Sequence, residues 1–489
     1  MSAKNTLKTL VMTFSAAAAV SACGGADEVA SPGEAAFSGA PAPTPPPPPP
    51  PPSNSGPPAD CPTGFINVGT ILDRTGDILR SCQLPQQVLG GLVVPERERT
   101  VYSVSGRVDV GQDQGGDFNS PLAGSQRGVL TVEAGVRVYG SAGLDFIVVN
   151  RGSQINVQGE PTLPVIMTSK QSIEGNTGVD SIGQWGGLVI LGRAPISNCP
   201  GTVTPGTPEC EAQVEGTNAF YGGNGPADNS GTLRYLRLMH SGFQILPNNE
   251  LNGITLAGVG NGTTIDFVQV HNSSDDGIEW FGGTVNARHL VMTGIDDDSF
   301  DSDVGFSGSI QFGIVVQRAN GGDRMNEFSG STRTPAANPK IANVTYVGRA
   351  GGGAGIVMNT GTDSEFYNVV VTRAAGGSGA GASCLDVDDA TTTGAFNSVF
   401  FSCPNAFDDD ASTAAATLFN AGAGNTSAGT STLTATFVNG ANETAVTAFA
   451  NLPSISSFFQ QVSYIGGVRD ASDTWWQGWT CGLTADTPC

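Results

Sequence analysis

Short strand-like runs recur through the middle of the chain at intervals just above 20 residues. Phe267, His289 and Phe312 occupy the same point of three successive runs, 22 and 23 residues apart. The corresponding residues of three later runs, 25 and 29 residues apart, are Asn343, Asn368 and Asn397. A period of this length with several short strands indicates the coils of a solenoid with loops of variable length.

The composition also favours strands and tight turns. The chain contains 68 glycines and only 13% charged residues, and no long amphipathic helix separates the runs. We therefore predict an all-β chain that forms a right-handed parallel β-helix, with disulfide-clipped loops and a C-terminal aromatic cap. Two β-sandwich domains are the competing fold, but they would not require acidic motifs to share the strand period.

Acidic residues do share that period. The sequence from Asp275 to Glu279 aligns with the sequence from Asp297 to Asp301, 22 residues later. Asp323 and Glu327 repeat the same spacing of acids in the next coil, which is longer. Successive coils lie about 4.8 Å apart, so these carboxylates would meet and would need protons, solvent or a cation. Oxygen ligands without Cys or His suit structural Ca²⁺. The predicted ligands are Asp275, Asp276, Glu279, Asp297, Asp298, Asp301, Asp303, Asp323 and Glu327.

Two other interpretations of the acidic residues stay open. They could form a solvated acidic face, or a catalytic carboxylate site of the kind that hydrolyses glycosides. The Asp-Asp pair resembles one motif of pectin-cleaving β-helix hydrolases, but the sequences around His240 and His271 lack the Gly-His-Gly of those enzymes. Polysaccharide lyases of this fold combine Ca²⁺ with a basic residue, for which Arg288 and Arg324 are the nearby candidates.

Eight cysteines fall into four local couples. Neighbour pairing is the simplest of the 105 possible pairings, and an oxidising compartment supports disulfides. The predicted pairs are Cys61 with Cys82, Cys199 with Cys210, Cys384 with Cys403, and Cys481 with Cys489.

The N-terminus predicts the compartment. Lys4 and Lys8 precede a short apolar stretch, and the sequence Val20-Ser21-Ala22-Cys23 resembles the lipobox of bacterial lipoproteins. The resemblance implies cleavage after residue 22, lipidation of Cys23, and an outer-membrane location that is favoured by Gly24. Residues 23–60 would form a tether, in which Pro45 to Pro52 is a polyproline rod of about 25 Å.

Five tryptophans could stack on a sugar ligand, although packing in the core or a cap is the simpler role for each. They are Trp185, Trp280, Trp475, Trp476 and Trp479.

Two motifs carry a resemblance that extends from about residue 61 to the C-terminus. One is the Gln-Trp-Gly-Gly sequence from Gln184 to Gly187, and the other is Asp-Asp-Gly-Ile-Glu-Trp-Phe-Gly-Gly-Thr-Val-Asn from Asp275 to Asn286. These motifs are similar to those of a family of large Gram-negative envelope lipoproteins and secreted parallel β-helix proteins. That family has no settled biochemical function, so the resemblance supports fold and location only.

The predicted organisation is a signal peptide (1–22), a lipidated tether (23–60), an N-terminal cap (61–97), a parallel β-helix (98–450) and a C-terminal cap (451–489). We expect a non-enzymatic, Ca²⁺-stabilised surface lipoprotein of the outer membrane that binds an extracellular glycan or an envelope partner such as a TonB-dependent uptake receptor. The alternatives are an acidic-polysaccharide lyase or glycoside hydrolase, and an adhesive or surface-structural protein. The formal charge of −22 disfavours nucleic acid as a partner.

Overall fold

The computed structural model describes residues 56–246, 249–331, 333–374, 383–408, 414–484 and 487–489. The predicted signal peptide, the lipidation site Cys23 and the proline run lie outside these residues. No helix in the described part of the chain is both long and apolar enough to cross a membrane.

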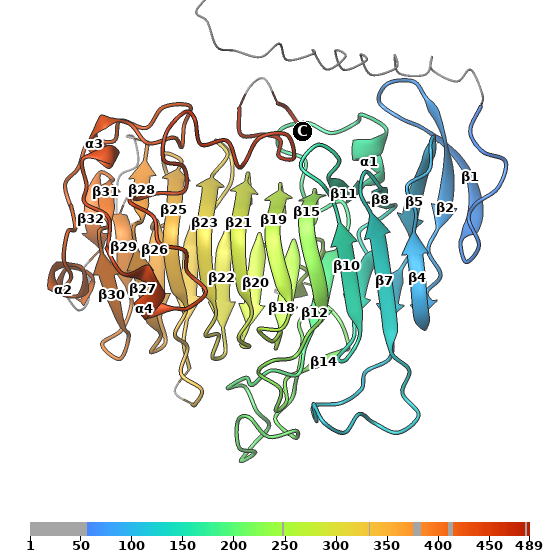
Figure 1. The fold of residues 1–489 in the computed structure, drawn as a ribbon, viewed down its shortest axis with the longest axis horizontal. Coiled ribbons are helices and arrows are strands. Elements are labelled where there is room, and N and C mark those ends of the chain that lie inside the picture. Colours follow the sequence, from blue (N-terminus) through green and yellow to red (C-terminus); the bar gives the residue numbers. More distant parts are fainter. Residues whose placement is uncertain (1–55, 247–248, 332, 375–382, 409–413, 485–486) are drawn as a thin grey trace, which may run out of the picture. The chain divides into compact units, whose positions relative to one another are not determined.

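The described chain winds into stacked coils whose strands pair in parallel with those of the next coil (Figure 1). One sheet has 17 strands. These are β1 (Ile66–Leu72), β2 (Ile78–Gln83), β4 (Gly90–Val94), β5 (Thr100–Val104), β7 (Gly128–Glu133), β8 (Arg137–Gly140), β10 (Gln154–Gln158), β11 (Val165–Ser169), β15 (Gly231–Met239), β19 (Thr264–His271), β21 (Asn286–Thr293), β23 (Ser309–Val316), β25 (Lys340–Gly348), β27 (Asp363–Tyr367), β28 (Val370–Arg373), β30 (Thr393–Asn397) and β31 (Phe400–Ser402).

A second sheet of 11 strands forms another side of the coils. Its strands are β3 (Gln87–Val88), β6 (Arg107–Val110), β9 (Phe146–Val149), β12 (Gly187–Leu191), β18 (Ile254–Ala257), β20 (Ile278–Phe281), β22 (Phe300–Asp303), β24 (Asn326–Ser329), β26 (Ile356–Asn359), β29 (Ser383–Val387) and β32 (Asn405–Asp408). Two short antiparallel pairs lie in loops: β13 (Ala212–Gln213) with β14 (Phe220–Tyr221), and β16 (Gln244–Leu246) with β17 (Asn249–Glu250). The predicted parallel β-helix is confirmed.

The long strands of the first sheet bend at one residue of positive φ. In β15 this residue is Tyr235, and the two arms of the strand pair separately with β10 and β11. The equivalent residues of the next strands are Phe267, His289 and Phe312, at φ 58°, 50° and 63°. L-residues rarely adopt this backbone region, and here it turns the strand from one face of the coil to the next.

The side chains of this row stack on one another. The ring centroids of Tyr235 and Phe267 are 4.4 Å apart, those of Phe267 and His289 are 4.2 Å apart, and those of His289 and Phe312 are 5.0 Å apart. The predicted alignment of these three residues is therefore confirmed. Asn343 and Asn368 continue the row, but Ser398 occupies the next place, because Asn397 pairs with Tyr367. The predicted alignment was wrong by one residue at that coil.

Alternation along the strands fills the interior with apolar side chains. On β22, Phe300 and Ser302 are buried inside, while Asp301 and Asp303 point outward. Large side chains such as Trp280 and Phe328 are fully buried, and Phe366 stacks on Phe396 at 5.1 Å. The helix α2 (Ala414–Ala421) closes the C-terminal end of this core, where Phe419 packs on Phe401 at 4.5 Å.

Parallel pairing begins earlier than expected. Strands β2, β3 and β4 already pair with β5, β6 and β7, whereas β1 pairs only with β2 and is antiparallel to it. The expected boundary at residue 98 therefore lies inside the first coils, and β1 is the element outside the parallel repeat.

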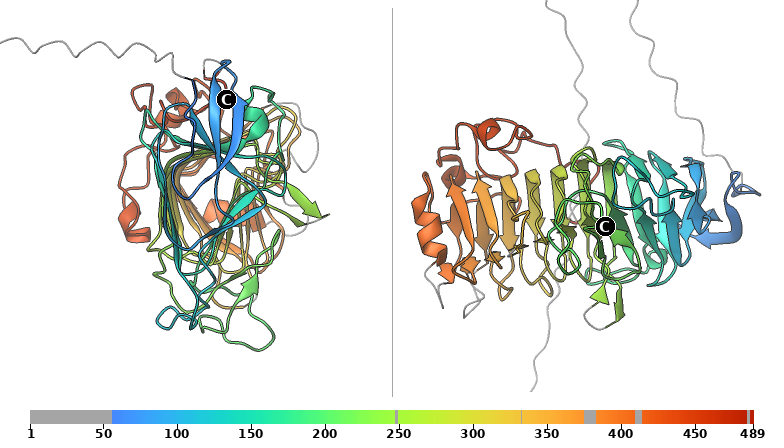
Figure 2. Two further views of the ribbon diagram at one scale, coloured as in Figure 1. Left: turned by 90° about the vertical axis from the view of Figure 1, so that its right-hand side faces the viewer. Right: turned by 90° about the horizontal axis from the view of Figure 1, so that it is seen from below.

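The segment after the last coil runs back along the outside of the first sheet. We call residues 432–484 the C-terminal strap; it includes α3 (Ala441–Thr444) and α4 (Leu452–Ile455). Figures 1 and 2 show it in red beside the strands. Its backbone is held in turn by Asn343, which donates to the Tyr464 carbonyl, and by Arg237, which donates to the Trp479 carbonyl. The aromatic C-terminus covers apolar surface as expected, but that surface is the side of the coils, and α2 covers their end.

All four predicted disulfides are confirmed. The Cys199–Cys210 bond closes a turn in the long loop between β12 and β15, and this loop packs on the outward face of the second sheet through residues such as Tyr221. The loop matters for the site described next, because it brings Glu215 to the same face. A remaining short helix, α1 (Lys170–Ile173), follows β11.

Candidate metal centre

The predicted acidic residues meet on the outward side of three consecutive strands of the second sheet. In the parallel register, Glu279 of β20 lies opposite Asp301 of β22, and Asp301 lies opposite Glu327 of β24. The turns before these strands bring Asp275 and Asp276 beside Asp297 and Asp298, since the amide of Gly277 donates to the Asp298 carbonyl. As the repeat of the sequence predicts, carboxylates one period apart therefore form rows that run along the stack of coils.

Three overlapping triads of carboxylates lie close enough to share a cation. In each triad one oxygen from every residue lies within 4.8 Å of the other two. The triads are Asp275, Asp276 and Asp297; Asp276, Glu279 and Asp301; and Asp297, Asp298 and Asp323. Of the nine predicted residues, Asp303 and Glu327 lie beside these triads and are not members of them.

Most of these carboxylates are poorly solvated and repel one another, although Asp297 is exposed. Asp276, Glu279 and Asp298 are only 8%, 5% and 5% exposed. Burial and then the charges of neighbouring acids raise the pKa of Asp276, Glu279 and Asp301 well above the usual value. For Asp275, burial and then the charges of Glu215 and Asp297 raise the pKa to about 8. In the absence of a cation, several of these groups would hold protons at neutral pH.

Among the nearby basic residues, Arg324 neutralises part of the negative charge, at the side of the cluster formed by Asp323 and Glu327. Arg324 pairs with Asp323, and its Nε lies 3.2 Å from Glu327 Oε2. Burial lowers the pKa of Arg324, but the charges of Glu327 and Asp298 outweigh burial and raise the pKa above its usual value. Arg288 lies on β21 in the other sheet, where its guanidinium stacks on Phe458 at 4.0 Å and donates to the Phe458 carbonyl. Arg288 is therefore not part of the acidic site.

Two further residues join the site. Asn252 donates from Nδ2 to Glu279 Oε2 at 2.5 Å and to Glu215 at 3.3 Å, while its buried Oδ1 has no hydrogen-bond partner. Asn252 precedes β18 at the position equivalent to Asp276, since Thr255 lies opposite Glu279, so the period could have revealed it. Glu215 comes from the long loop between β12 and β15 that contains the Cys199–Cys210 disulfide. It lies outside the repeat and far from the other acids in the sequence, so the sequence pattern did not predict that it joins the site.

The donor set fits a hard divalent cation. All of the grouped ligands are carboxylates, and the unpartnered Asn252 amide oxygen is a further hard donor beside them. A cation bound to these oxygens would neutralise charges that otherwise oppose the stacking of β20, β22 and β24. The residues present therefore fit Ca²⁺ better than a softer metal.

Three of the five tryptophans are unavailable to a ligand. Trp185, Trp280 and Trp479 are fully buried. Trp185 donates to the Met239 carbonyl at 2.8 Å, and Trp280 stacks on Phe306 in the interior at 5.3 Å. Ligand stacking is therefore wrong for these three, because the coils and the strap cover them. Trp475 and Trp476 are half-buried in the strap.

Comparison with protein families gives a match that covers most of the chain. Residues 105–480 match the family described as a pectate-lyase like beta helix domain. Comparison with curated proteins and with solved structures gave no match.

Proposed function

From the premise that the chain belongs to the pectate-lyase-like β-helix family, we propose that it is a Ca²⁺-stabilised binding protein of the outer membrane that does not catalyse a reaction. Cys23 would carry the lipid anchor, and residues 24–60 would tether the β-helix to the membrane. Its partner would be an extracellular glycan or an envelope protein of the uptake-receptor type.

The observation that carries this proposal is the vertical register of Glu279, Asp301 and Glu327. A structural cation needs acids from several coils, because it then links the coils to one another. The three triads meet this requirement, since each joins residues of two successive coils.

A lyase is the second candidate, and membership of the family favours it. Such an enzyme needs a group that removes a proton from the sugar. Arg324 is the basic residue beside the acids, and its raised pKa keeps it protonated and paired with Asp323 and Glu327. This pairing favours a structural role for Arg324 over a role as a base.

A glycan would find hydrogen-bonding groups beside apolar surface on the first sheet. A groove of about 400 Å³ is lined by Gln158, Thr232 and Arg234, and a smaller one of about 190 Å³ by Asn261, Asp266 and Asn286. Amide, hydroxyl and charged groups of this kind hydrogen-bond to sugar hydroxyls. We therefore place the glycan on this side of the coils, away from the acidic residues.

The experiment is a binding and turnover screen of the protein against acidic and neutral polysaccharides in millimolar Ca²⁺. We expect saturable binding to at least one polysaccharide, weakened by Arg234→Ala, with no reducing sugar and no unsaturated product. Glu209→Gln, at an exposed residue in the loop between β12 and β15, is the control and should leave binding unchanged. Product that forms only with Ca²⁺ and disappears in Arg324→Gln would establish the lyase instead, and self-association without saturable binding would establish an adhesive protein.

A further inference from the structure

The two grooves of the first sheet in which the proposed function places the glycan are neighbours along the stack of coils. The larger groove includes Arg234 of β15, and the smaller one includes Asp266 of β19 and Arg288 of β21. In the parallel register Arg234 lies opposite Asp266, and Asp266 lies opposite Arg288. We call these three residues the charged row, because a positive, a negative and a positive side chain follow one another across both grooves.

Arg234 carries a charge that no acidic residue of the protein neutralises. Its side chain is exposed and forms no ion pair with any residue that the structure describes. The guanidinium lies over the rings of Tyr235 and Phe267, at 5.6 and 5.9 Å from their centroids. Such cation–π contacts orient the guanidinium but leave its positive charge in place. In a chain with a net charge of −22, an unpaired arginine in a groove favours an anionic group on the ligand.

Arg288 also lacks an ion pair within the described part of the chain. Its guanidinium stacks on Phe458 at 4.0 Å, and Nη2 donates to the Phe458 carbonyl. Nε is enclosed without a partner, but Nη1 is not among the enclosed polar atoms of the described residues. Arg288 therefore offers a second charged donor, in the smaller groove.

Asp266 separates the two arginines. Its Oδ1 accepts a hydrogen bond from Nδ1 of His289 at 2.7 Å. Its Oδ2 has no hydrogen-bond partner among the described residues and is not enclosed. This oxygen can accept from a hydroxyl or an amide N–H of a ligand, whereas it repels a carboxylate.

The spacing of the charged row selects a pattern of charge in the ligand. Two steps between adjacent strands separate the strand of Arg234 from that of Arg288, which corresponds to about 10 Å. One sugar of an extended polysaccharide lengthens the chain by nearly the same distance as one such step. Acidic groups on alternate sugars would therefore meet the two arginines, while the sugar between them meets Asp266.

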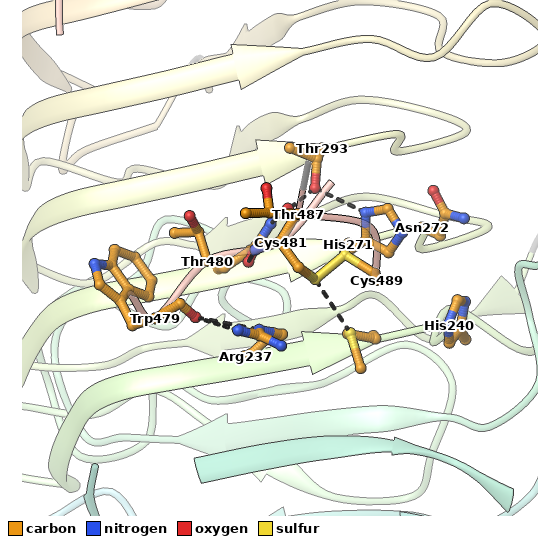
Figure 3. The surroundings of a disulfide bond; sticks show 12 residues. Arg237, His240, His271, Asn272, Thr293, Trp479, Thr480, Cys481, Thr487 and Cys489 are labelled. Carbon is orange, nitrogen blue, oxygen red and sulfur yellow. Dashed lines mark hydrogen bonds between the residues drawn. A yellow bond between two sulfur atoms is a disulfide. The ribbon is translucent and has the colours of Figure 1, made fainter. Parts of the chain in front are cut away.

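The C-terminal strap fixes the surroundings of the charged row. Gln311 of β23 lies opposite Arg288, and its amide both donates to and accepts from the backbone of Gln460. Further along the strap, Arg237 donates to the Trp479 carbonyl, as Figure 3 shows. Because the strap is bound to the first sheet at both points, the row is ordered before a ligand arrives, which lowers the entropic cost of binding.

We propose that the charged row selects a polysaccharide in which acidic sugars alternate with neutral ones. Carboxylates of two acidic sugars bind Arg234 and Arg288, and hydrogen-bond donors of the neutral sugar between them bind Asp266. This inference rests on the proposed function, because it names the class of glycan that the two grooves take. It does not depend on the cation at the acidic site of the second sheet.

The test is calorimetric titration of the full chain in millimolar Ca²⁺ with three hexasaccharides. One comes from hyaluronan, in which glucuronate alternates with N-acetylglucosamine. The comparators come from polygalacturonate, which is acidic at every sugar, and from cellulose, which is neutral. We expect the hyaluronan hexasaccharide to bind about tenfold more tightly than either comparator, because it alone matches all three charges of the row.

Two variants separate the contributions of charge. Arg234→Met should weaken binding of the hyaluronan hexasaccharide about tenfold and leave binding of the neutral one unchanged. Asp266→Asn should bring the affinity for the polygalacturonate hexasaccharide to within about twofold of that for hyaluronan, because the repulsion of its middle carboxylate is removed. Lys170→Met is the control, since it removes an exposed positive charge on α1 and should change neither affinity.

The outcomes distinguish this inference from the proposed function. Absence of binding to any polysaccharide would overturn both. Saturable binding with the same affinity for the alternating hexasaccharide and for either comparator would overturn the inference and leave the proposed function standing. Unchanged affinity for hyaluronan in a folded Arg234→Met variant would have the same consequence.

Discussion

Glu279 on β20 lies directly opposite Asp301 on β22, and both belong to one carboxylate triad with Asp276. Two acids in adjacent parallel strands oppose the pairing that places them together, unless a proton or a cation intervenes. The arrangement therefore links the stability of the coils to what occupies the acidic site.

Glu279→Gln should change stability in opposite directions with and without Ca²⁺. In EGTA, the substitution should stabilise the domain by about 1 kcal/mol, because folding no longer has to bury a carboxyl group whose raised pKa makes it take up a proton or remain charged beside Asp301. In Ca²⁺, loss of a ligand should weaken cation affinity about tenfold and reduce the gain in Tm. Thermal unfolding of both forms checks this, with Glu209→Gln as the matched control. A change of the same sign in both buffers would contradict it.

The stability of the Ca²⁺-free protein should fall as pH rises. The pKa of Asp275 is raised from 3.8 to about 8, so its stabilising contribution is complete below the unfolded value and is lost as pH rises through about 8. Ca²⁺ replaces the protons, so the increase in Tm on adding Ca²⁺ should grow over this range. Unfolding at a series of pH values in EGTA and in Ca²⁺ measures this. Asp275→Asn should flatten the EGTA curve, and an unchanged curve would exclude Asp275 as its source.

Trp479→Ala should release the C-terminal strap. The Trp479 ring is fully buried against Phe267 and Tyr235, at 5.9 and 6.0 Å, so its loss should cost about 3 to 5 kcal/mol. Denaturant unfolding gives that free energy, and limited proteolysis should cut the strap before the coils. Phe220→Ala, at a residue that is 40% exposed, should cost less than about 1 kcal/mol. Equal costs for the two variants would show that the strap is not held by its aromatic contacts.

Cys23→Ser should move the protein from the membrane to the soluble fraction. We expect the wild type to incorporate labelled palmitate and to sediment with the outer membrane, because several acyl chains give stable anchoring. The variant should do neither. Cys384→Ser with Cys403→Ser is the control for loss of cysteine, and it should remain in the membrane.

The periodic part of the fold was predictable because parallel coils repeat a local pattern. Residues one period apart touch, so Phe267 and His289 could be aligned from sequence, and the acidic rows followed from the same step. The alignment failed at Asn397, where a longer coil moves the bend to Ser398. Loops of variable length change the number of residues between equivalent positions, while the strands of successive coils still pair in register.

The strap and Glu215 could not be predicted in the same way. The strap lies beside strands that are far away in sequence, as the contact between Gln269 and Cys481 shows, and no repeat connects them. Apolar residues on the outward side of the first sheet, such as Val291 and Ile314, required a cover, but alternation alone does not say which segment provides it. The burial of Trp479 is a consequence of that cover.

The central claim is that the acidic rows bind a cation that holds the coils together. The most direct measurement is thermal unfolding of the full chain in EGTA and in millimolar Ca²⁺, with Mg²⁺ as the comparison ion. The account predicts a rise in Tm of about 3 °C or more with Ca²⁺ at about a hundred times Kd, a smaller rise with Mg²⁺, and loss of the rise in Asp301→Asn. An identical Tm in EGTA and Ca²⁺ would contradict it and leave the carboxylates protonated rather than metal-bound.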